Sequence, residues 1–192
     1  MSAVSRLRAE RRSFSDHALL RAVASGDPAA LGELYDRYAA AMWSAVARTL
    51  GSRADARDVV HAVFLKLASI APSYDGRPSA RSWLVGIAVR AALRHRRSVR
   101  RFWNMVARAP QRGPHFGDPE SQASGRQELQ QVAEAFAKLS IRKRAVFTLV
   151  ELEGLSTEEA ALALGIPAAT VRTRLHHARR ELGVALKSGK SS

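Results

Sequence analysis

Residues 156–180 of this chain read STEEAALALGIPAATVRTRLHHARR, and this stretch decides the fold of the C-terminal part. Ser156 and Glu159 have the spacing of a capping box, in which the hydroxyl and the carboxylate satisfy free amides at a helix start. Gly165 ends the short helix that follows, because a helix C-terminus favours a residue with positive φ. Pro167 then opens a second helix. Two helices joined by a glycine-containing turn are typical of a helix-turn-helix, which places its second helix in the DNA major groove.

The second of these helices, expected over about 168–187, has an apolar face and a basic face. The apolar stripe follows the i, i+4, i+7, i+11 spacing of a core-facing surface and consists of Val171, Leu175, Ala178 and Leu182. The opposite side offers hydrogen-bond donors and positive charge from Arg172, Thr173, His176, His177 and Arg180. In a major groove such residues would meet base edges and phosphates. The alternative is an ordinary solvated face, but the capped helix before the turn favours DNA contact.

The adjacent His176 and His177 also raise the question of a metal site. Neighbouring residues on a helix do not face each other, so two adjacent imidazoles cannot hold one ion with good geometry. We therefore expect these histidines to contact bases or phosphates, and we expect no metal.

The N-terminal half also has helical periodicity throughout, with a basic line on its last helix. Helices are expected over about 16–25, 28–50, 52–70 and 79–101, with Asp27, Ser52 and Ser79 as N-caps and a breaker loop over 72–78. On the last of them one line along the helix consists of Trp83, Ile87, Arg90, Arg94, Arg97 and Arg101. Arginines with no acidic partner on their stripe face solvent or an anion, and we interpret them as a phosphate track. Trp83 could stack on an unpaired base or simply belong to the core, and the sequence leaves both open.

Composition limits the classes of protein that remain. The chain of 192 residues has 31 Lys plus Arg against 17 Asp plus Glu, a formal charge of +14 that calls for a polyanionic partner. There is no cysteine, and hence no disulfide or thiolate metal site. Neither a secretory signal nor an apolar run long enough to span a membrane is found, so we expect a cytoplasmic protein.

The fold class that follows is all-α, with two small helical domains joined by a flexible linker and a helix-turn-helix in the second. Proline and glycine interrupt the stretch from about 102 to 126, which we interpret as the linker, with a short helix possible around 103–107. Helices are then expected over about 127–139, 141–153, 157–164 and 168–187. The predicted division is: tail 1–15, domain 16–101, linker 102–126, domain 127–187 and tail 188–192, both tails being disordered.

Three stretches resemble the extracytoplasmic-function sigma factors of the sigma-70 superfamily. They are DARDVVHAVFLK at 55–66, YDGRPSARSWLVGIA at 74–88, and GLSTEEA at 154–160 followed by LGIPAATVRTRLHHAR at 164–179. The resemblance implies that 16–101 is sigma region 2 and 127–187 is sigma region 4. It implies a protein that binds core RNA polymerase, recognises and melts the minus-ten element, and reads the minus-35 element of promoter DNA. A regulating anti-sigma factor is a further expected partner.

The resemblance also assigns residues to these tasks. It assigns contact with the beta-prime clamp of polymerase to Asp58, His61, Ala62 and Leu65. The family usually has Gln-Glu at the positions of His61 and Ala62. The minus-ten element falls to Tyr74, Asp75, Gly76, Arg77, Ser79, Trp83, Arg90, Arg94 and Arg97, with the loop capturing an extruded base. The minus-35 element falls to Arg172, Thr173, His176, His177 and Arg180.

Two other functions are compatible with parts of the sequence. An autonomous helix-turn-helix regulator would explain the C-terminal half and the charge, but not the loop and arginine line of 74–101. The rival from another class is an enzyme that acts on nucleic acid. The sequence has no His-Glu-x-x-His, phosphate-binding glycine loop or carboxylate cluster, and Asp58 with His61 supplies only two possible ligands. We therefore expect no enzyme activity, no catalytic residue and no cofactor.

Overall fold

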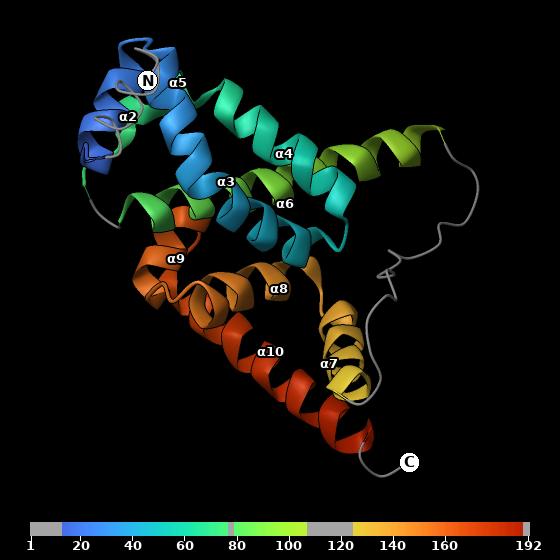
Figure 1. Ribbon diagram of the computed structural model, residues 1–192. Coiled ribbons are helices and arrows are strands. Elements are labelled where there is room, and N and C mark those ends of the chain that lie inside the picture. Colours follow the sequence, from blue (N-terminus) through green and yellow to red (C-terminus); the bar gives the residue numbers. More distant parts are fainter. Residues whose placement is uncertain (1–12, 77–78, 107–124, 190–192) are drawn as a thin grey trace.

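The computed structural model describes residues 13–76, 79–106 and 125–189, and within these ranges every regular element is helical (Figure 1). The N-terminal half contains α2 (Asp16–Ala24), α3 (Pro28–Leu50), α4 (Arg53–Leu65), α5 (Leu67–Ile70), a 3₁₀ turn (Ala71–Ser73) and α6 (Ala80–Val106). The C-terminal half contains α7 (Gly125–Lys138), α8 (Ile141–Phe147), a π-helical turn (Thr148–Leu152), α9 (Thr157–Leu164) and α10 (Ala168–Gly189). The all-α fold predicted from the sequence is therefore confirmed. Residues 1–12 of the predicted tail 1–15, residues 190–192 of the predicted tail 188–192, Arg77, and residues 107–124 of the predicted linker 102–126 lie outside the described residues.

The predicted caps place the helices of the N-terminal half. The Asp27 carboxylate accepts hydrogen bonds from the amides of Ala29 and Ala30 at 2.9 and 3.2 Å, with Pro28 at the first helical position of α3. Ser52 and Ser79 accept in the same way at the starts of α4 and α6.

Two helix boundaries in this half differ from the prediction. The helix expected over 52–70 is broken at Lys66, where α4 ends and α5 begins. The last helix, expected to stop at 101, continues to Val106, so that residues 103–106 of the short helix foreseen around 103–107 are part of α6.

The C-terminal half contains the predicted helix-turn-helix. Ser156 and Glu159 form both bonds of the capping box, at 3.1 and 2.8 Å, and Gly165 ends α9 with φ of 65°. The four residues of the apolar stripe on α10 are all buried, as predicted. The helix expected over 141–153 is instead α8 plus a π-helical turn, and α10 extends two residues beyond the predicted 187.

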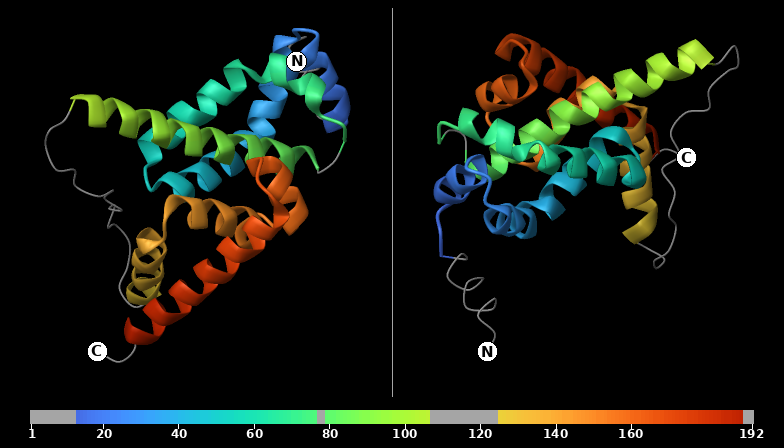
Figure 2. Two further views of the ribbon diagram at one scale, coloured as in Figure 1. Left: turned by 180° about the vertical axis from the view of Figure 1, so that it is seen from behind. Right: turned by 90° about the horizontal axis from the view of Figure 1, so that it is seen from above.

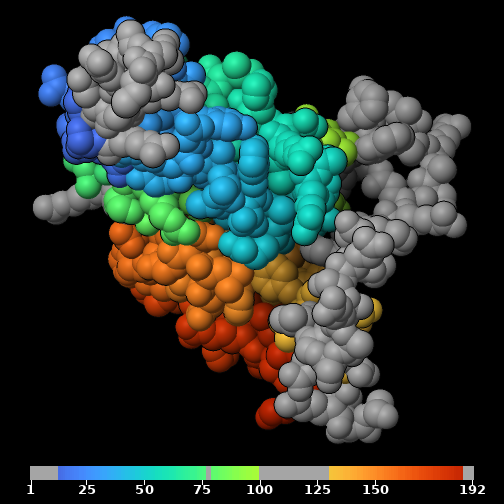
Figure 3. All heavy atoms as spheres, viewed as in Figure 1, coloured from blue at the N-terminus to red at the C-terminus, as the bar shows by residue number. Residues whose placement is uncertain are grey.

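The two halves pack against each other, which the sequence did not predict. The first half of α6 lies on α9, and α3 and α6 also contact α8 (Figure 2). One buried cluster runs through both halves, joining Leu34, Val46 and Leu84 to Leu149 and Leu164. Figure 3 shows the resulting seam between the blue-to-green and the orange-to-red parts. We call this arrangement the docked form.

Gly86 makes this close packing possible. A Cβ atom added to Gly86 would lie 2.5 Å from the Cβ atom of Ala163, closer than side chains approach in proteins. Any residue larger than glycine would therefore push α9 away from α6. No helix within the described ranges is sufficiently long and apolar to traverse a lipid bilayer.

Candidate nucleic-acid interface

The first candidate surface is an open groove beside α4, which we call the α4 groove. Asp58, His61, Ala62 and Leu65 share one exposed face of α4, and together with Tyr35, Trp43 and Arg57 they line a groove of about 360 Å³. Leu65 is 73% exposed, which is unusual for a large apolar side chain. The ring of Tyr35 packs against Phe64 and Trp43, with centroids 4.8 and 6.0 Å apart. Aromatic walls beside an exposed leucine and a charged rim are features of a protein-binding surface.

The second candidate surface is built around Tyr74, and we call it the Tyr74 site. Tyr74 follows the 3₁₀ turn, and its ring lies 5.1 Å from that of Trp83 at an interplanar angle of 53°. Both rings are half-buried and pack against the core, so Trp83 belongs to the core and borders the loop at once. Asp75, Gly76 and Ser79 of the same loop are exposed. Partly exposed aromatic rings in a loop provide stacking surfaces for unpaired bases.

The electrostatics of this loop keep the Tyr74 hydroxyl protonated. Burial raises the pKa of Tyr74 above its usual value, and the carboxylates of Asp16 and Asp75 act in the same direction. The hydroxyl therefore remains a hydrogen-bond donor across the neutral and mildly alkaline range.

The arginine line of α6 divides between solvent and the seam. Arg90, Arg94 and Arg97 are all exposed on α6. The guanidinium of Arg90, however, lies against the turn of the helix-turn-helix, because a Cβ atom on Gly165 would be 3.0 Å from its Nη2 atom. In the docked form Arg90 therefore contacts the C-terminal half.

The third candidate surface is the exposed side of α10, which we call the α10 face. Arg172, Thr173, His176 and Arg180 are exposed and His177 is half-buried. The Thr173 hydroxyl donates to the carbonyl of Ala169 at 2.9 Å, and the two imidazole rings lie 5.8 Å apart. This face thus presents hydrogen-bond donors, with the charged Arg172 near the N-terminal end of α10, a pattern suited to the recognition of base edges.

Arg172 has an acidic neighbour on α9. Its Nη1 atom donates to the Glu158 carboxylate at 3.2 Å, and both side chains are exposed. A hydrogen bond from the Thr157 hydroxyl, one from the backbone and the charge of Arg172 lower the pKa of Glu158. An exposed ion pair of this kind is weak, so an anion of higher charge density can replace the Glu158 carboxylate as the partner of Arg172.

A salt bridge that the sequence did not indicate joins the two halves. Glu153 is buried at the seam, and its two carboxylate oxygens accept hydrogen bonds from Arg48 of α3 and Arg81 of α6, each at 2.7 Å. The Glu153 side chain is 2% exposed, whereas the arginines are 40% and 46% exposed. One buried carboxylate from the C-terminal half is thus held by two arginines of the N-terminal half.

Like charges face each other elsewhere along the same seam. Arg144 of α8 is buried, and its pKa is lowered by burial and by the charge of Arg96 on α6. The pKa of Arg174 on α10 is lowered by burial and by the charges of Arg142 and Arg97. The repulsions from Arg96 and Arg97, which lie on α6 in the other half, oppose the docking that Glu153 supports.

Within the described ranges, no group of three or more His, Asp or Glu side chains is arranged to hold a metal ion. The arrangement consists of an open groove beside α4, an aromatic loop beside basic residues, and a helix-turn-helix with an exposed donor face. A helix-turn-helix with an exposed donor face is typical of the class of DNA-binding proteins.

Two family models match the chain. The model for Sigma-70 region 2 covers residues 34–102, and the model for Sigma-70, region 4 covers residues 129–182. The chain is 37% identical over 168 residues to the ECF RNA polymerase sigma factor SigL of Mycobacterium tuberculosis, covering 85% of this chain and 93% of that protein. It is 32% identical to the RNA polymerase sigma factor CnrH of Cupriavidus metallidurans, covering 90% of this chain and 94% of that protein.

Solved structures agree with these matches. The structure of CnrH in complex with the cytosolic domain of CnrY has a TM-score of 0.62 at 28% identity, covering 91% of this chain and 99% of that chain. The sigma factor RpoE of Bartonella quintana, in complex with the anti-sigma factor NepR, has the same fold with a TM-score of 0.55 at 21% identity, covering 77% of this chain and 90% of that chain.

The chain belongs to the extracytoplasmic-function group of the sigma-70 family, as the sequence resemblance indicated. Its function is promoter-specific initiation of transcription by RNA polymerase, and an autonomous regulator is not favoured.

Proposed function

We propose that the three surfaces divide the work of a sigma factor among them. The α4 groove binds the beta-prime clamp of core RNA polymerase, the Tyr74 site captures an extruded base of the minus-ten element, and the α10 face reads the minus-35 element. The observation that carries this proposal is the α4 groove. It brings the four residues assigned to polymerase into one lining, and one of them, Leu65, is an exposed apolar side chain that a monomer alone does not need.

In this proposal residues 16–101 act as region 2 and residues 127–187 as region 4, with the stretch between them as the linker. Arg94 and Arg97 follow the phosphates of the duplex beside the minus-ten element. Arg90 joins them only when α6 and α9 separate, because it contacts the turn at Gly165 in the docked form.

Reading both promoter elements requires that the halves separate. The names of the elements place them about 25 base pairs apart, which is roughly 85 Å along duplex DNA at about 3.4 Å per base pair. A compact chain of this length has a radius of gyration of roughly 16 Å, so the docked form is too small to reach both. We infer that region 4 leaves region 2 when the protein occupies a promoter.

An anti-sigma factor is the further partner that we propose. The structures of CnrH and RpoE described above contain CnrY and the anti-sigma factor NepR, respectively. The α4 groove offers the exposed apolar surface that such a protein needs for binding. We also propose that the chain acts in the cytoplasm, where promoter DNA is found, and that it has no enzymatic activity of its own.

Run-off transcription with purified core polymerase tests the proposal. The full chain added to core polymerase should give a new transcript start site on a promoter selected by holoenzyme binding. An autonomous regulator would bind DNA without creating a start site, and that result would overturn the proposal. Metal-dependent cleavage of DNA by the purified chain would overturn its non-enzymatic part.

A further inference from the structure

Helix α2 contacts the Tyr74 site although it precedes the part of the chain that the region 2 model matches. That match begins at residue 34, whereas α2 spans Asp16–Ala24. The helix packs on α5 and on the 3₁₀ turn Ala71–Ser73, which leads directly into Tyr74. Its buried residues Leu19, Leu20 and Val23 belong to the main core cluster. The loop is therefore supported by an element outside the matched segment.

One side chain of α2 contacts the aromatic pair itself. The ring of His17 lies 6.0 Å from the ring of Tyr74 at an interplanar angle of 45°. Tyr74 thus has an aromatic neighbour on α2 as well as Trp83 on α6. His17 is exposed, and the other two rings are half-buried. The three rings form one patch that reaches solvent, contributed by three separate segments.

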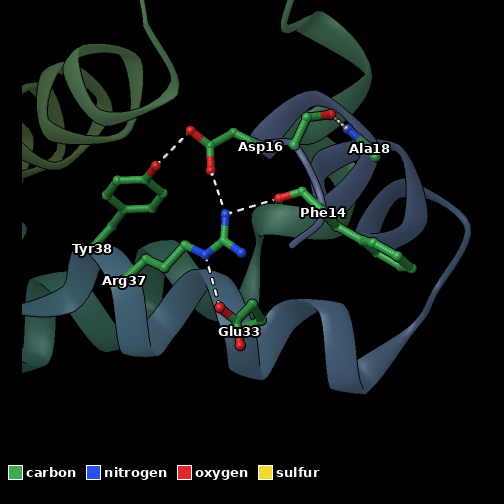
Figure 4. Close-up of polar contacts among 7 residues, drawn as sticks. Phe14, Asp16, Ala18, Glu33, Arg37 and Tyr38 are labelled. Carbon is green, nitrogen blue, oxygen red and sulfur yellow. Dashed lines mark hydrogen bonds and ion pairs between the residues drawn. The ribbon is translucent and has the colours of Figure 1, made fainter. Parts of the chain in front are cut away.

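The start of α2 is held to α3 by a network that does not involve the loop (Figure 4). Asp16 accepts a hydrogen bond from the Tyr38 hydroxyl at 2.5 Å and another from Arg37 at 2.9 Å. Arg37 also donates to Glu33 at 2.8 Å and to the carbonyl of Phe14 at 3.1 Å. Since Asp16 immediately precedes His17, this network holds the backbone next to His17 through bonds that do not involve Tyr74.

The hydrogen bond from Tyr38 to Asp16 is maintained over a wide pH range. Burial and the hydrogen bond to Asp16 raise the pKa of Tyr38 to about 12. The hydroxyl is therefore protonated and donating at every physiological pH. The Asp16 carboxylate also raises the pKa of Tyr74, which indicates that the network lies close to the Tyr74 site.

We propose that His17 is a positioning residue for the capture of an unpaired base. Its ring limits the orientations that Tyr74 can adopt, so that the tyrosine is already placed for stacking when the minus-ten element opens. Stacking between aromatic groups depends on their mutual orientation, and a ring ordered in advance loses less entropy on binding. This inference rests on the proposed function, because it assigns His17 to the base that the Tyr74 site would hold.

The test compares His17→Ala and His17→Phe in holoenzyme reconstituted with core polymerase. A promoter duplex carrying 2-aminopurine in the minus-ten element reports strand opening as a rise in fluorescence. His17→Ala should slow or reduce opening by roughly threefold to tenfold, the range expected for one aromatic pair. His17→Phe keeps the aromatic ring and should restore opening. Ala24→Gln, an exposed change at the far end of α2, should match the unaltered chain.

A purely structural role would not produce this pattern. His17 is exposed, so thermal unfolding and assembly with core polymerase should be the same for both variants. Removing single bases from the non-template strand adds a specific signature. The abasic position that costs the unaltered chain most affinity should cost His17→Ala less.

The outcomes separate this inference from the function on which it rests. Opening by His17→Ala equal to that of the unaltered chain would overturn the inference, as would equal impairment of His17→Ala and His17→Phe. Tyr74→Ala serves as the reference variant. If Tyr74→Ala slows opening and His17→Ala does not, only the role of His17 is wrong. If neither variant affects opening, the assignment of the Tyr74 site to the minus-ten element is wrong.

Discussion

Glu153→Gln should loosen the docked form while leaving each half folded. The substitution keeps the shape of the side chain and removes the charge that Arg48 and Arg81 share. Hydrogen bonds to charged groups contribute about 1.5–3 kcal/mol each. The arginines are nearly half exposed and regain water when the bond is lost, so we discount the sum of two such bonds to about 2 kcal/mol. That free energy lowers the ratio of docked to separated molecules roughly 30-fold.

The natural chain contains no cysteine, which makes the distance between the halves simple to measure. Ser44→Cys on α3 and Lys187→Cys on α10 are exposed labelling positions in different halves. Energy transfer between dyes at these positions should fall in the Glu153→Gln background. Circular dichroism should show the same helix content, because the helices themselves are untouched.

Glu151→Gln is the matched control, since Glu151 forms an exposed ion pair with Arg179 inside the C-terminal half. It removes the same charge two residues away without touching the seam. Unchanged energy transfer in Glu153→Gln would show that the salt bridge does not stabilise docking. An equal fall in both variants would show that net charge, and not this bridge, controls the arrangement.

Four further outcomes are expected. Arg172→Ala should weaken binding of the minus-35 element by holoenzyme by about 1–3 kcal/mol and relax specificity at one base position. A competition assay with promoters substituted at single positions measures both effects. An equal loss of affinity for all sequences would show that Arg172 contacts a phosphate and not a base. Asp58→Ala should reduce association with core polymerase in a pull-down without lowering the melting temperature, whereas undiminished retention would remove Asp58 from the α4 groove contact. Ser156→Ala should destabilise the C-terminal half by about 1 kcal/mol, because it removes an N-cap; thermal unfolding measures the loss, and an unchanged midpoint would refute it. The Tyr38 phenol should ionise near pH 12, so the stability that its bond to Asp16 supplies is complete below about pH 10 and is lost as pH rises toward 12. Absorbance measured during an alkaline titration should show this late ionisation in the unaltered chain and not in Tyr38→Phe. Ionisation of all three tyrosines at the same pH would contradict the prediction.

Local sequence signals predicted the helices and the helix-turn-helix well. Caps and breakers act over a few residues, so Asp27, Ser52 and the capping box of Ser156 could be identified from the sequence. The apolar stripe of α10 was also correct, because helical periodicity determines which face is buried.

Contacts between distant segments could not be predicted in this way. Glu153 follows a helix and has nothing in its neighbourhood that indicates burial, since its partners lie 105 and 72 residues away. Gly86 is inside a helical pattern, where glycine signals only a loss of helix propensity, and its packing against Ala163 emerges from the tertiary fold alone. The role of His17 was missed for the same reason, because α2 and the loop at Tyr74 meet only through folding.

The buried cluster that runs through both halves makes the two proposed promoter contacts interdependent. Separating the halves exposes apolar surface and breaks the salt bridges to Glu153, which requires free energy. This free energy is spent only once, when the first of the two DNA elements binds. The second element then meets a molecule that is already open and binds more tightly by the same factor, whatever the order. A promoter carrying both elements would thus be favoured over the sum of two half-sites, and this cooperativity would need no contact between the DNA-bound domains.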